Sequence, residues 1–211
     1  MIGIFGGTFD PVHYGHIKPA LSIKAALNLS QLRIVPNSIP PHRDPPWLST
    51  EQRLLLLKSA LADHADVIID ERELKRGGAS YMIDTLRSLR GEFPDEDLCL
   101  IIGMDAFMGI TSWFEWQSLF ALCHLVVTTR PGFEQSEWMD QMDAEDHQFL
   151  SARMVGHVDA LTPHETGKIL LQSVPQLDIS STEIRAGLLN NDDVRQWMPE
   201  RVYQQLREIK L

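Results

Sequence analysis

Residues Ile2–His16 have the sequence IGIFGGTFDPVHYGH, and this stretch decides the fold. A short apolar strand, Ile2–Phe5, runs into two glycines, and a helix is expected from about Gly15 to Leu27. Glycine lets a backbone approach a ligand closely, and the first N–H groups of a helix have no acceptor within it. The stretch therefore predicts a phosphate-binding turn. It is neither a G-x-G-x-x-G dinucleotide turn nor a Walker loop, which would need Gly-Lys-Ser/Thr.

Short apolar runs alternate with helical segments along the rest of the chain. Strands are expected at Leu32–Pro36, Val67–Asp70, Leu98–Ile102, His124–Thr128 and Val174–Leu177. Helices are expected at Glu51–Ala62 after a Ser49 or Thr50 cap, at Ser80–Arg90, within the polar and acidic segment Gln135–Phe149, and, short ones, at Val194–Met198 and Pro199–Ile209. This alternation predicts an α/β fold, a parallel sheet with helices on both faces and a small helical C-terminal appendage.

Composition narrows the function classes. The chain has 19 basic and 29 acidic residues, a net charge of −10, which argues against nucleic acid or an anionic membrane as a partner but allows a local basic pocket. The longest apolar run, Leu98–Met104, is too short to span a bilayer, and the N-terminus lacks signal-peptide features. Cys99 and Cys123 lie in apolar segments, as buried free thiols do. We expect a cytoplasmic protein, and the sequence leaves open whether it forms a homo-oligomer.

His13 and His16 are spaced so that they share a face of one helical turn. One interpretation is a pair of imidazole donors for phosphate oxygens, and another is metal ligation, although two histidines without a third ligand make a weak metal site. A third is a pair that only caps the helix or satisfies the core. The glycines before them, and their place between strand and helix, favour phosphate binding.

Two motifs at opposite ends of the chain carry a family resemblance. GTFDP at Gly7–Pro11, joined to HYGH at His13–His16, resembles the N-terminal signature of the HxGH nucleotidylyltransferase superfamily. ISSTEIR at Ile179–Arg185 resembles its second signature, I-S-S-T-x-I-R. Segments between them resemble bacterial nicotinate-mononucleotide adenylyltransferases: Val35–Arg43, Tyr81–Leu86, Ile102–Phe107 and Arg130–Gly132. Met82 and Met104 depart from the residues usual in that family.

This resemblance implies a Rossmann-like nucleotidylyltransferase domain at 1–178 and a C-terminal helical segment at 179–211 that carries the second ATP motif, the two forming a single functional unit. The implied reaction transfers AMP from ATP to nicotinate mononucleotide and yields deamido-NAD (nicotinate adenine dinucleotide) and pyrophosphate, a step of NAD biosynthesis. The acceptor phosphate attacks in line, without a covalent intermediate. Mg²⁺ is the implied cofactor, held mainly by the ATP phosphates and not by a set of protein ligands.

The resemblance also assigns residues. The implied catalytic residues are His16 above all, with His13 and Arg185. The implied ATP site comprises Gly6, Gly7, Thr8, Phe9, His13, His16, Gly103, Asp105, Ile179, Ser180, Ser181, Thr182 and Arg185. The implied nicotinate mononucleotide site comprises Asn37, His42, Arg43, Tyr81, Thr85, Asp105, Trp113 and Arg130. In that site Trp113 would stack on the pyridine ring, Thr85 and nearby backbone amides would receive the carboxylate, and Arg43 would meet the phosphate.

Two other hypotheses stay open at this point. A related adenylyltransferase could use nicotinamide mononucleotide or another phosphorylated acceptor such as phosphopantetheine, and acceptor assays would separate these activities. A nucleotide-binding sensor without turnover would need a damaged motif, whereas His13, His16 and Arg185 are all present.

Overall fold

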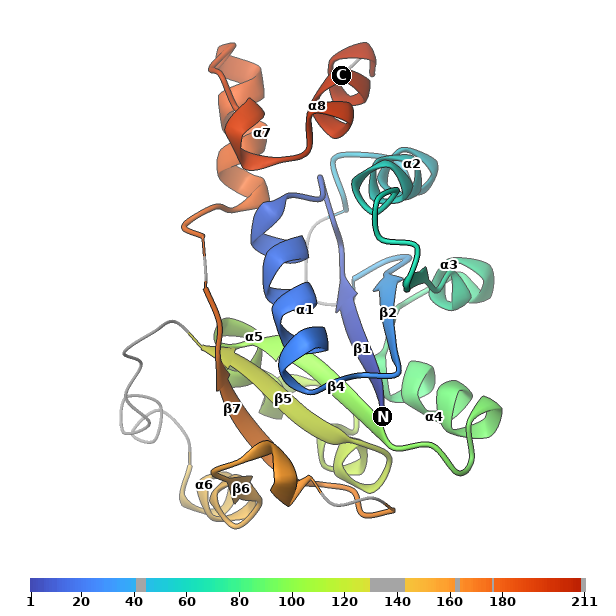
Figure 1. Ribbon diagram of the computed structural model, residues 1–211, viewed down its shortest axis with the longest axis vertical. Coiled ribbons are helices and arrows are strands. Elements are labelled where there is room, and N and C mark those ends of the chain that lie inside the picture. The colour runs from blue at the N-terminus through green and yellow to red at the C-terminus, as the bar shows by residue number, and fades with distance from the viewer. Residues whose placement is uncertain (41–44, 130–142, 162–163, 176, 210–211) are drawn as a thin grey trace.

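The computed structural model describes residues 1–40, 45–129, 143–161, 164–175 and 177–209 (Figure 1). The strands within these ranges are β1 (Ile2–Gly7), β2 (Gln31–Pro36), β3 (Val67–Ile69), β4 (Leu98–Gly103), β5 (His124–Thr129), β6 (Met154–Val155) and β7 (Ile169–Ser173). They pair in parallel, in the order β3-β2-β1-β4-β5-β7-β6. The predicted parallel sheet is confirmed.

Helices cover the sheet and close the chain. The α-helices are α1 (Tyr14–Ala26), α2 (Thr50–Ala60), α3 (Arg72–Arg76), α4 (Met82–Glu92), α5 (Met104–Met108), α6 (Ala144–Ser151), α7 (Ser181–Asn190) and α8 (Glu200–Glu208). The 3₁₀ turns are η1 (Ile110–Ser112), η2 (Trp116–Ala121), η4 (Val158–Ala160) and η5 (Arg195–Trp197). Figure 1 shows β1 and β2 pointing toward the end of the molecule where α7 and α8 lie.

Side chains that alternate along each strand divide the core into two layers, because successive side chains of a strand point to opposite faces. Cys99 and Ile101 of β4 pack in one layer with the buried residues of α1 and α2. Leu98, Leu100 and Ile102 pack in the other layer with those of α4. Strands that are buried on both faces have continuous apolar sequences, which is why this run could be recognised without a helical or alternating pattern. Helices on both faces are thus confirmed.

Local capping fixes where two of the helices begin. Ser49 accepts the N–H of Gln52 at 3.3 Å, and the Gln52 side chain accepts the Ser49 N–H at 2.8 Å, a capping box that starts α2. Ser180 and Glu183 form the same arrangement at α7. Each box satisfies backbone donors that the first turn leaves without partners. The cap predicted for α2 is confirmed, with Ser49 as the N-cap residue.

The strand predicted at Val174–Leu177 is wrong. The last strand is β7, Ile169–Ser173, which pairs with β5 from Leu125↔Ile169 to Thr129↔Ser173. Pro175 has no N–H to give to a sheet ladder, which explains why the pairing stops before it. Other short elements were also not predicted: α3, α5 and β6, and the 3₁₀ turns η1, η2 and η4. Helix α6 lies in the segment predicted to hold a surface helix, whose residues 135–142 are outside the described part.

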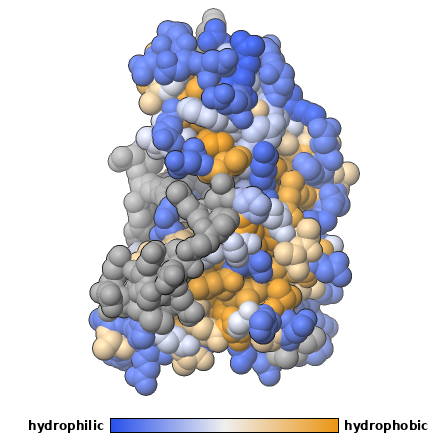
Figure 2. All heavy atoms as spheres, turned by 60° about the vertical axis from the view of Figure 1, so that its left-hand side comes forward, coloured by the Kyte–Doolittle hydropathy of each residue, from blue (hydrophilic) through white to orange (hydrophobic). Residues whose placement is uncertain are grey.

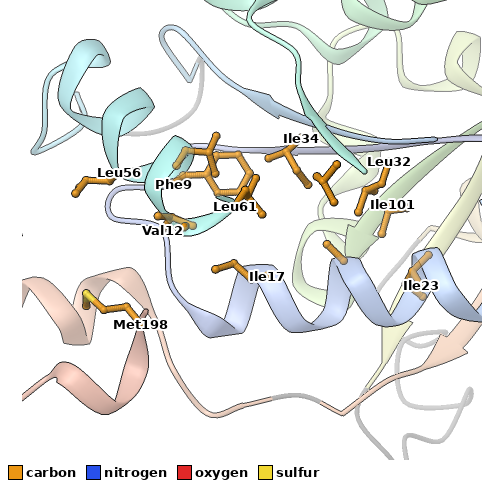
Figure 3. Packing of buried hydrophobic residues seen from close by; sticks show 14 of the residues in the cluster. Phe9, Val12, Ile17, Ile23, Leu32, Ile34, Leu56, Leu61, Ile101 and Met198 are labelled. Carbon is orange, nitrogen blue, oxygen red and sulfur yellow. The ribbon is translucent and has the colours of Figure 1, made fainter. Parts of the chain in front are cut away.

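The C-terminal helices share the core of the sheet domain. Val202 and Leu206 of α8 belong to the layer that contains Leu56 and Leu57 of α2, and Ser59 of α2 donates to Gln205 of α8 at 2.6 Å. Met198 of the same segment belongs to this layer as well, and Figure 3 shows it on the side of Val12 that faces away from Phe9. The outward surface of this end is mostly hydrophilic (Figure 2). The C-terminal helices therefore pack on the sheet domain through one apolar face, which includes Val202 and Leu206.

Two further expectations concern cysteines and membranes. Cys99 and Cys123 are free and buried, as predicted, and burial raises the pKa of the Cys123 thiol to about 12. Burial likewise raises the pKa of Cys99. Neither thiol is therefore a reactive nucleophile at neutral pH. Among the described helices, none has the length and apolarity needed to cross a membrane.

Candidate active site

The strand order places the phosphate-binding turn at the middle of the sheet. From β1 the chain goes outward through β2 and β3, and it then returns to the other side of β1 with β4. In open parallel sheets, ligands bind at the carboxyl ends of the strands where the order reverses in this way. The loop Gly7–His13 follows β1 at that edge, and Gly103 ends the neighbouring strand β4.

His13 joins this loop to α1. It is the N-cap residue, and its Nδ1 accepts the N–H of Gly15 at 3.1 Å. The side chain is 3% exposed, and burial lowers its pKa to about 4, with nearby Glu183 opposing part of the shift. His13 is therefore neutral at pH 7, and because Nδ1 is an acceptor the ring proton lies on Nε2. The capping interpretation is confirmed, and it leaves a neutral N–H donor in the ring.

His16 packs against His13 and Phe9. The two imidazole rings lie 3.8 Å apart between centroids, and the Phe9 ring meets His16 edge-on at 5.2 Å. Phe9 is 2% exposed and has a positive φ of 50°, a conformation that costs a non-glycine residue about 1–2 kcal/mol. Burial of its ring offsets that cost. The loop is thus held in a strained shape by packing beneath the histidines.

The second motif contacts the first. Arg185 of α7 donates from Nη1 to the carbonyl of Asp10 at 2.7 Å and from Nη2 to Thr182 at 3.1 Å. Ser181 donates to the carbonyl of Pro11 at 3.1 Å, across 170 residues of sequence. A Cβ at Gly15 would lie 3.2 Å from the carbonyl of Ile179 and closer still to the His13 ring, so glycine there permits the approach. The fold brings both ends of the chain to one place.

The N-terminus of α7 faces this junction. Ser180 uses its hydroxyl in the capping box, where it donates to Glu183 at 2.7 Å. Thr182 is exposed. The backbone N–H groups of the first turn carry partial positive charge. Together with Arg185 they place positive charge at this end of the site, beside the carboxylates of Asp10 and Glu183.

The loop after β2 lies beside the loop after β1. The N–H of Asn37 donates to the carbonyl of Gly7 at 3.0 Å, and its side-chain amide donates to the Thr8 hydroxyl at 3.0 Å. Asn37 therefore supports the turn that the sequence assigns to ATP. His42 and Arg43, predicted in the same loop, lie outside the described residues, as does Arg130 after β5.

Aromatic side chains gather where α4 begins. Tyr81 is the N-cap residue of α4, and its ring lies 4.9 Å from that of Phe114, which is 53% exposed. The neighbouring Trp113 is half-buried and packs against the core layer of α4. Asp105, in the first turn of α5 directly after β4, is exposed. These residues offer flat apolar faces and one exposed carboxylate.

Thr85 is placed differently from its neighbours. Its side chain is fully buried, donates to the Glu73 carboxylate at 2.5 Å and accepts from Arg76 at 3.3 Å. Burial raises the pKa of Glu73. In this conformation the Thr85 hydroxyl faces α3 and is closed to solvent. Its contact with a nicotinate carboxylate stays a prediction.

Asp10 and Arg53 had no predicted role, and both hold the loops of the site in place through hydrogen bonds. The Asp10 carboxylate accepts the backbone N–H groups of Trp47 and Leu48 at 2.7 and 2.9 Å. Arg53 is 1% exposed and donates to the loops after β1 and β2. A signal for Arg53 was present, because it stands on the buried stripe of α2 with Leu56 and Leu57, where a charged residue needs partners.

Metal ligation has little support from side chains. Across the described ranges, no three His, Cys, Asp or Glu side chains come close enough together to hold a metal ion. Exposed Asp105 has the hard oxygen ligands that Mg²⁺ prefers. A single carboxylate such as Asp105 suits a Mg²⁺ ion whose other ligands are phosphate oxygens.

Comparison with known proteins gives the family. Residues 4–187 match the cytidylyltransferase-like family. Probable nicotinate-nucleotide adenylyltransferases from Aeromonas hydrophila and Halorhodospira halophila are 43% and 45% identical to this chain. Each alignment covers 98% of this chain, and 94% and 93% of the respective relative.

The fold has solved counterparts. The structure of Plasmodium falciparum nicotinic acid mononucleotide adenylyltransferase complexed with NaAD superposes with a TM-score of 0.72. The match covers 98% of this chain and 94% of that one, at 16% identity, and so bears on the fold alone. The family match and the alignments to these relatives each span most of the chain, and together they show the family. The chain belongs to the cytidylyltransferase-like family and, within it, to the nicotinate-nucleotide adenylyltransferases.

Proposed function

We propose that the protein transfers the AMP group of ATP to the 5′-phosphate of nicotinate mononucleotide, a step of NAD biosynthesis. An oxygen of the acceptor phosphate attacks the α-phosphorus of ATP, the bond to the bridging oxygen breaks, and pyrophosphate leaves. The observation that carries this proposal is the junction of the two motifs. Arg185 and Ser181 bind the backbone of residues 10–11, beside His13.

The chemistry asks for positioning and for neutralisation of charge. The acceptor phosphate is already an anion at neutral pH, so no general base is required. What lowers the barrier is alignment of two polyanions and donors directed at the leaving group. The neutral His13 has an Nε2–H to donate, Arg185 supplies fixed positive charge, and the first turn of α7 adds backbone N–H groups. His16, whose ring lies 3.8 Å from that of His13, is the residue that we assign to stabilising the charge of the transition state.

Mg²⁺ fits this site as part of the nucleotide complex. When bound with ATP, it neutralises negative charge on the phosphates and on the departing pyrophosphate. Asp105 is the side chain that we assign to its outer shell or to a ribose hydroxyl. In this proposal phosphate oxygens supply most of its ligands.

The acceptor would lie on the side of Asn37 and Trp113. The half-buried indole of Trp113 offers a face for the pyridine ring, as aromatic side chains do for flat heterocycles. Arg43, with His42 and Arg130, is assigned to the mononucleotide phosphate. We assign the carboxylate to Thr85 and to backbone amides near Trp113, an arrangement that requires Thr85 to turn from Glu73. We also propose that the enzyme acts in the cytoplasm, where free thiols such as Cys99 persist.

The test is pyrophosphate release from ATP and Mg²⁺ with each mononucleotide in turn. We expect rapid release with nicotinate mononucleotide and little with the amide. Comparable rates would retain the reaction but contradict an acid-selective pocket. Preference for the amide, or release with neither, would overturn the assignment of the acceptor, and other phosphorylated acceptors would then be assayed.

A further inference from the structure

Arg53 of α2 is a charged side chain that lies almost wholly inside the protein. It is 1% exposed, and its guanidinium makes five hydrogen bonds. Nη1 donates to the carbonyls of Thr8 and Asn37 at 2.8 and 3.0 Å and to the Asn37 side chain at 3.4 Å. Nη2 donates to the carbonyl of Ser38 at 3.2 Å and to the hydroxyl of Thr50 at 3.3 Å.

These partners belong to two loops and one helix. Thr8 is in the loop after β1, Asn37 and Ser38 are in the loop after β2, and Thr50 begins α2. The loops also contact each other, through the bond from the Asn37 N–H to the carbonyl of Gly7. Arg53 therefore joins three segments at the carboxyl edge of the sheet from beneath, without itself reaching solvent.

The balancing negative charge comes in part from the same loops. Burial lowers the pKa of Arg53, and the Asp10 carboxylate opposes that shift. Asp10 accepts the amides of Trp47 and Leu48, so it ties the far end of the loop after β2 to the loop after β1. Burying a guanidinium costs free energy, which its hydrogen bonds must offset. A methionine would fill the volume but would leave these backbone carbonyls without a donor, so the arginine fixes the positions of the two loops as well as filling the space.

We propose that Arg53 is a positioning residue for adenylyl transfer, setting the separation between the loop that receives ATP and the loop that receives the acceptor phosphate. The inference rests on the proposed function, because it takes the two loops as the binding sites of the two substrates. A planar guanidinium holds several carbonyls in a fixed geometry, whereas a lysine ammonium presents one point charge on a flexible stem. In-line transfer depends on this separation, since a displacement of about 1 Å can lower a rate by about 10²-fold.

The experiment compares R53M and R53K with the wild type, each purified as the full chain. Initial rates give kcat and both KM values, and thermal unfolding gives Tm. For R53M we expect a loss of about 10²-fold in kcat, with KM values close to those of the wild type. R53K keeps the charge but loses the planar guanidinium and its several N–H donors, so its kcat should fall between those of R53M and the wild type.

Arg33 supplies the matched control. It lies on β2, with a side chain that is 11% exposed, and donates to Asp70 at 2.8 Å outside both loops. R33M and R33K should lower Tm, as loss of a buried ion pair does, and should keep the wild-type kcat at a temperature where all variants are folded. If R33M loses kcat as strongly as R53M, the effect is one of stability and the proposal is wrong.

The remaining outcomes are equally decisive. Wild-type kcat in R53M or in R53K would overturn the positioning role while leaving the proposed function intact. If R53M does not fold, the kcat of R53K alone tests the positioning role, because the lysine retains the buried charge. A wild type that is inactive with every mononucleotide would overturn the proposed function, and this inference with it.

Discussion

At the scale of single residues, the histidine pair illustrates how far a motif can be interpreted. The spacing of His13 and His16 predicted one shared face, and the two ring centroids do lie only 3.8 Å apart. The sequence could not separate capping from phosphate binding. His13 caps α1 with one ring nitrogen and can still bind phosphate, because its other ring nitrogen carries a proton. Its burial, a product of tertiary packing, was not visible in the sequence.

The first prediction concerns His16. His16→Ala should lower kcat by roughly 10²–10³-fold, the scale of losing one donor to a transition state. Steady-state pyrophosphate release measures it. His157→Ala is the control, since His157 is exposed at the start of η4, remote from the motifs in sequence. Near-normal turnover in His16→Ala would remove this residue from the catalytic assignment.

The second prediction is a dependence of stability on pH. The pKa of His13 is about 4 in the folded protein and about 6.5 when exposed, because burial disfavours the imidazolium. Between these values the unfolded chain binds more protons, so the free energy of unfolding rises with pH. The stability is fully present above pH 6.5 and is lost as the pH falls toward 4, by up to about 3 kcal/mol.

His13→Asn isolates this effect. Asparagine still accepts an N–H as a helix cap but does not titrate, so the variant should show a shallower loss of stability across the same window. Urea unfolding at pH 7 and at several values down to pH 4.5 measures both proteins. Parallel curves for the two would mean that other groups cause the acid sensitivity and that His13 titrates normally.

At the scale of elements, sequence patterns succeeded where each local signal agreed with the fold. Continuous apolar runs located β1, β2, β4 and β5, and a serine cap located the start of α2. The last strand was placed too late because Ile169–Ser173 has leucines in place of β-branched residues, while its identity as a strand comes from pairing with β5. The roles of Asp10 and Arg53 likewise depend on partners distant in sequence.

The third prediction belongs to the start of α7. Ser180→Ala breaks the capping box and should cost about 1 kcal/mol of stability. It should also raise KM for ATP, because the first turn that we assign to phosphate binding loses its alignment. Asp143→Ala is a matched control: Asp143 caps α6 through the N–H groups of Glu145 and Asp146. An equal effect of the two variants on KM would contradict a role of the α7 cap in binding ATP.

At the scale of the whole molecule, the site exists only when both ends of the chain are folded together. The loop after β1 contributes the histidines, and α7 contributes Arg185, which donates to Asp10 across 175 residues of sequence. The C-terminal helices enter the same core layer as α1 and α2. We therefore propose that 179–211 and 1–178 form one functional unit. A nucleotide site built from both ends makes folding of the whole chain a condition of binding.

The last prediction follows from that shared core. Leu206 is 1% exposed on α8 and packs in the layer that holds α2, whereas Leu189 of α7 is 68% exposed. Leu206→Ala should cost about 2–5 kcal/mol, and Leu189→Ala within about 0.5 kcal/mol of zero. Urea unfolding of Leu206→Ala, followed by far-UV circular dichroism and by tryptophan fluorescence, should give one lowered midpoint with both probes. Two separate midpoints would instead mean that the C-terminal helices unfold independently, and the single-unit proposal would fail.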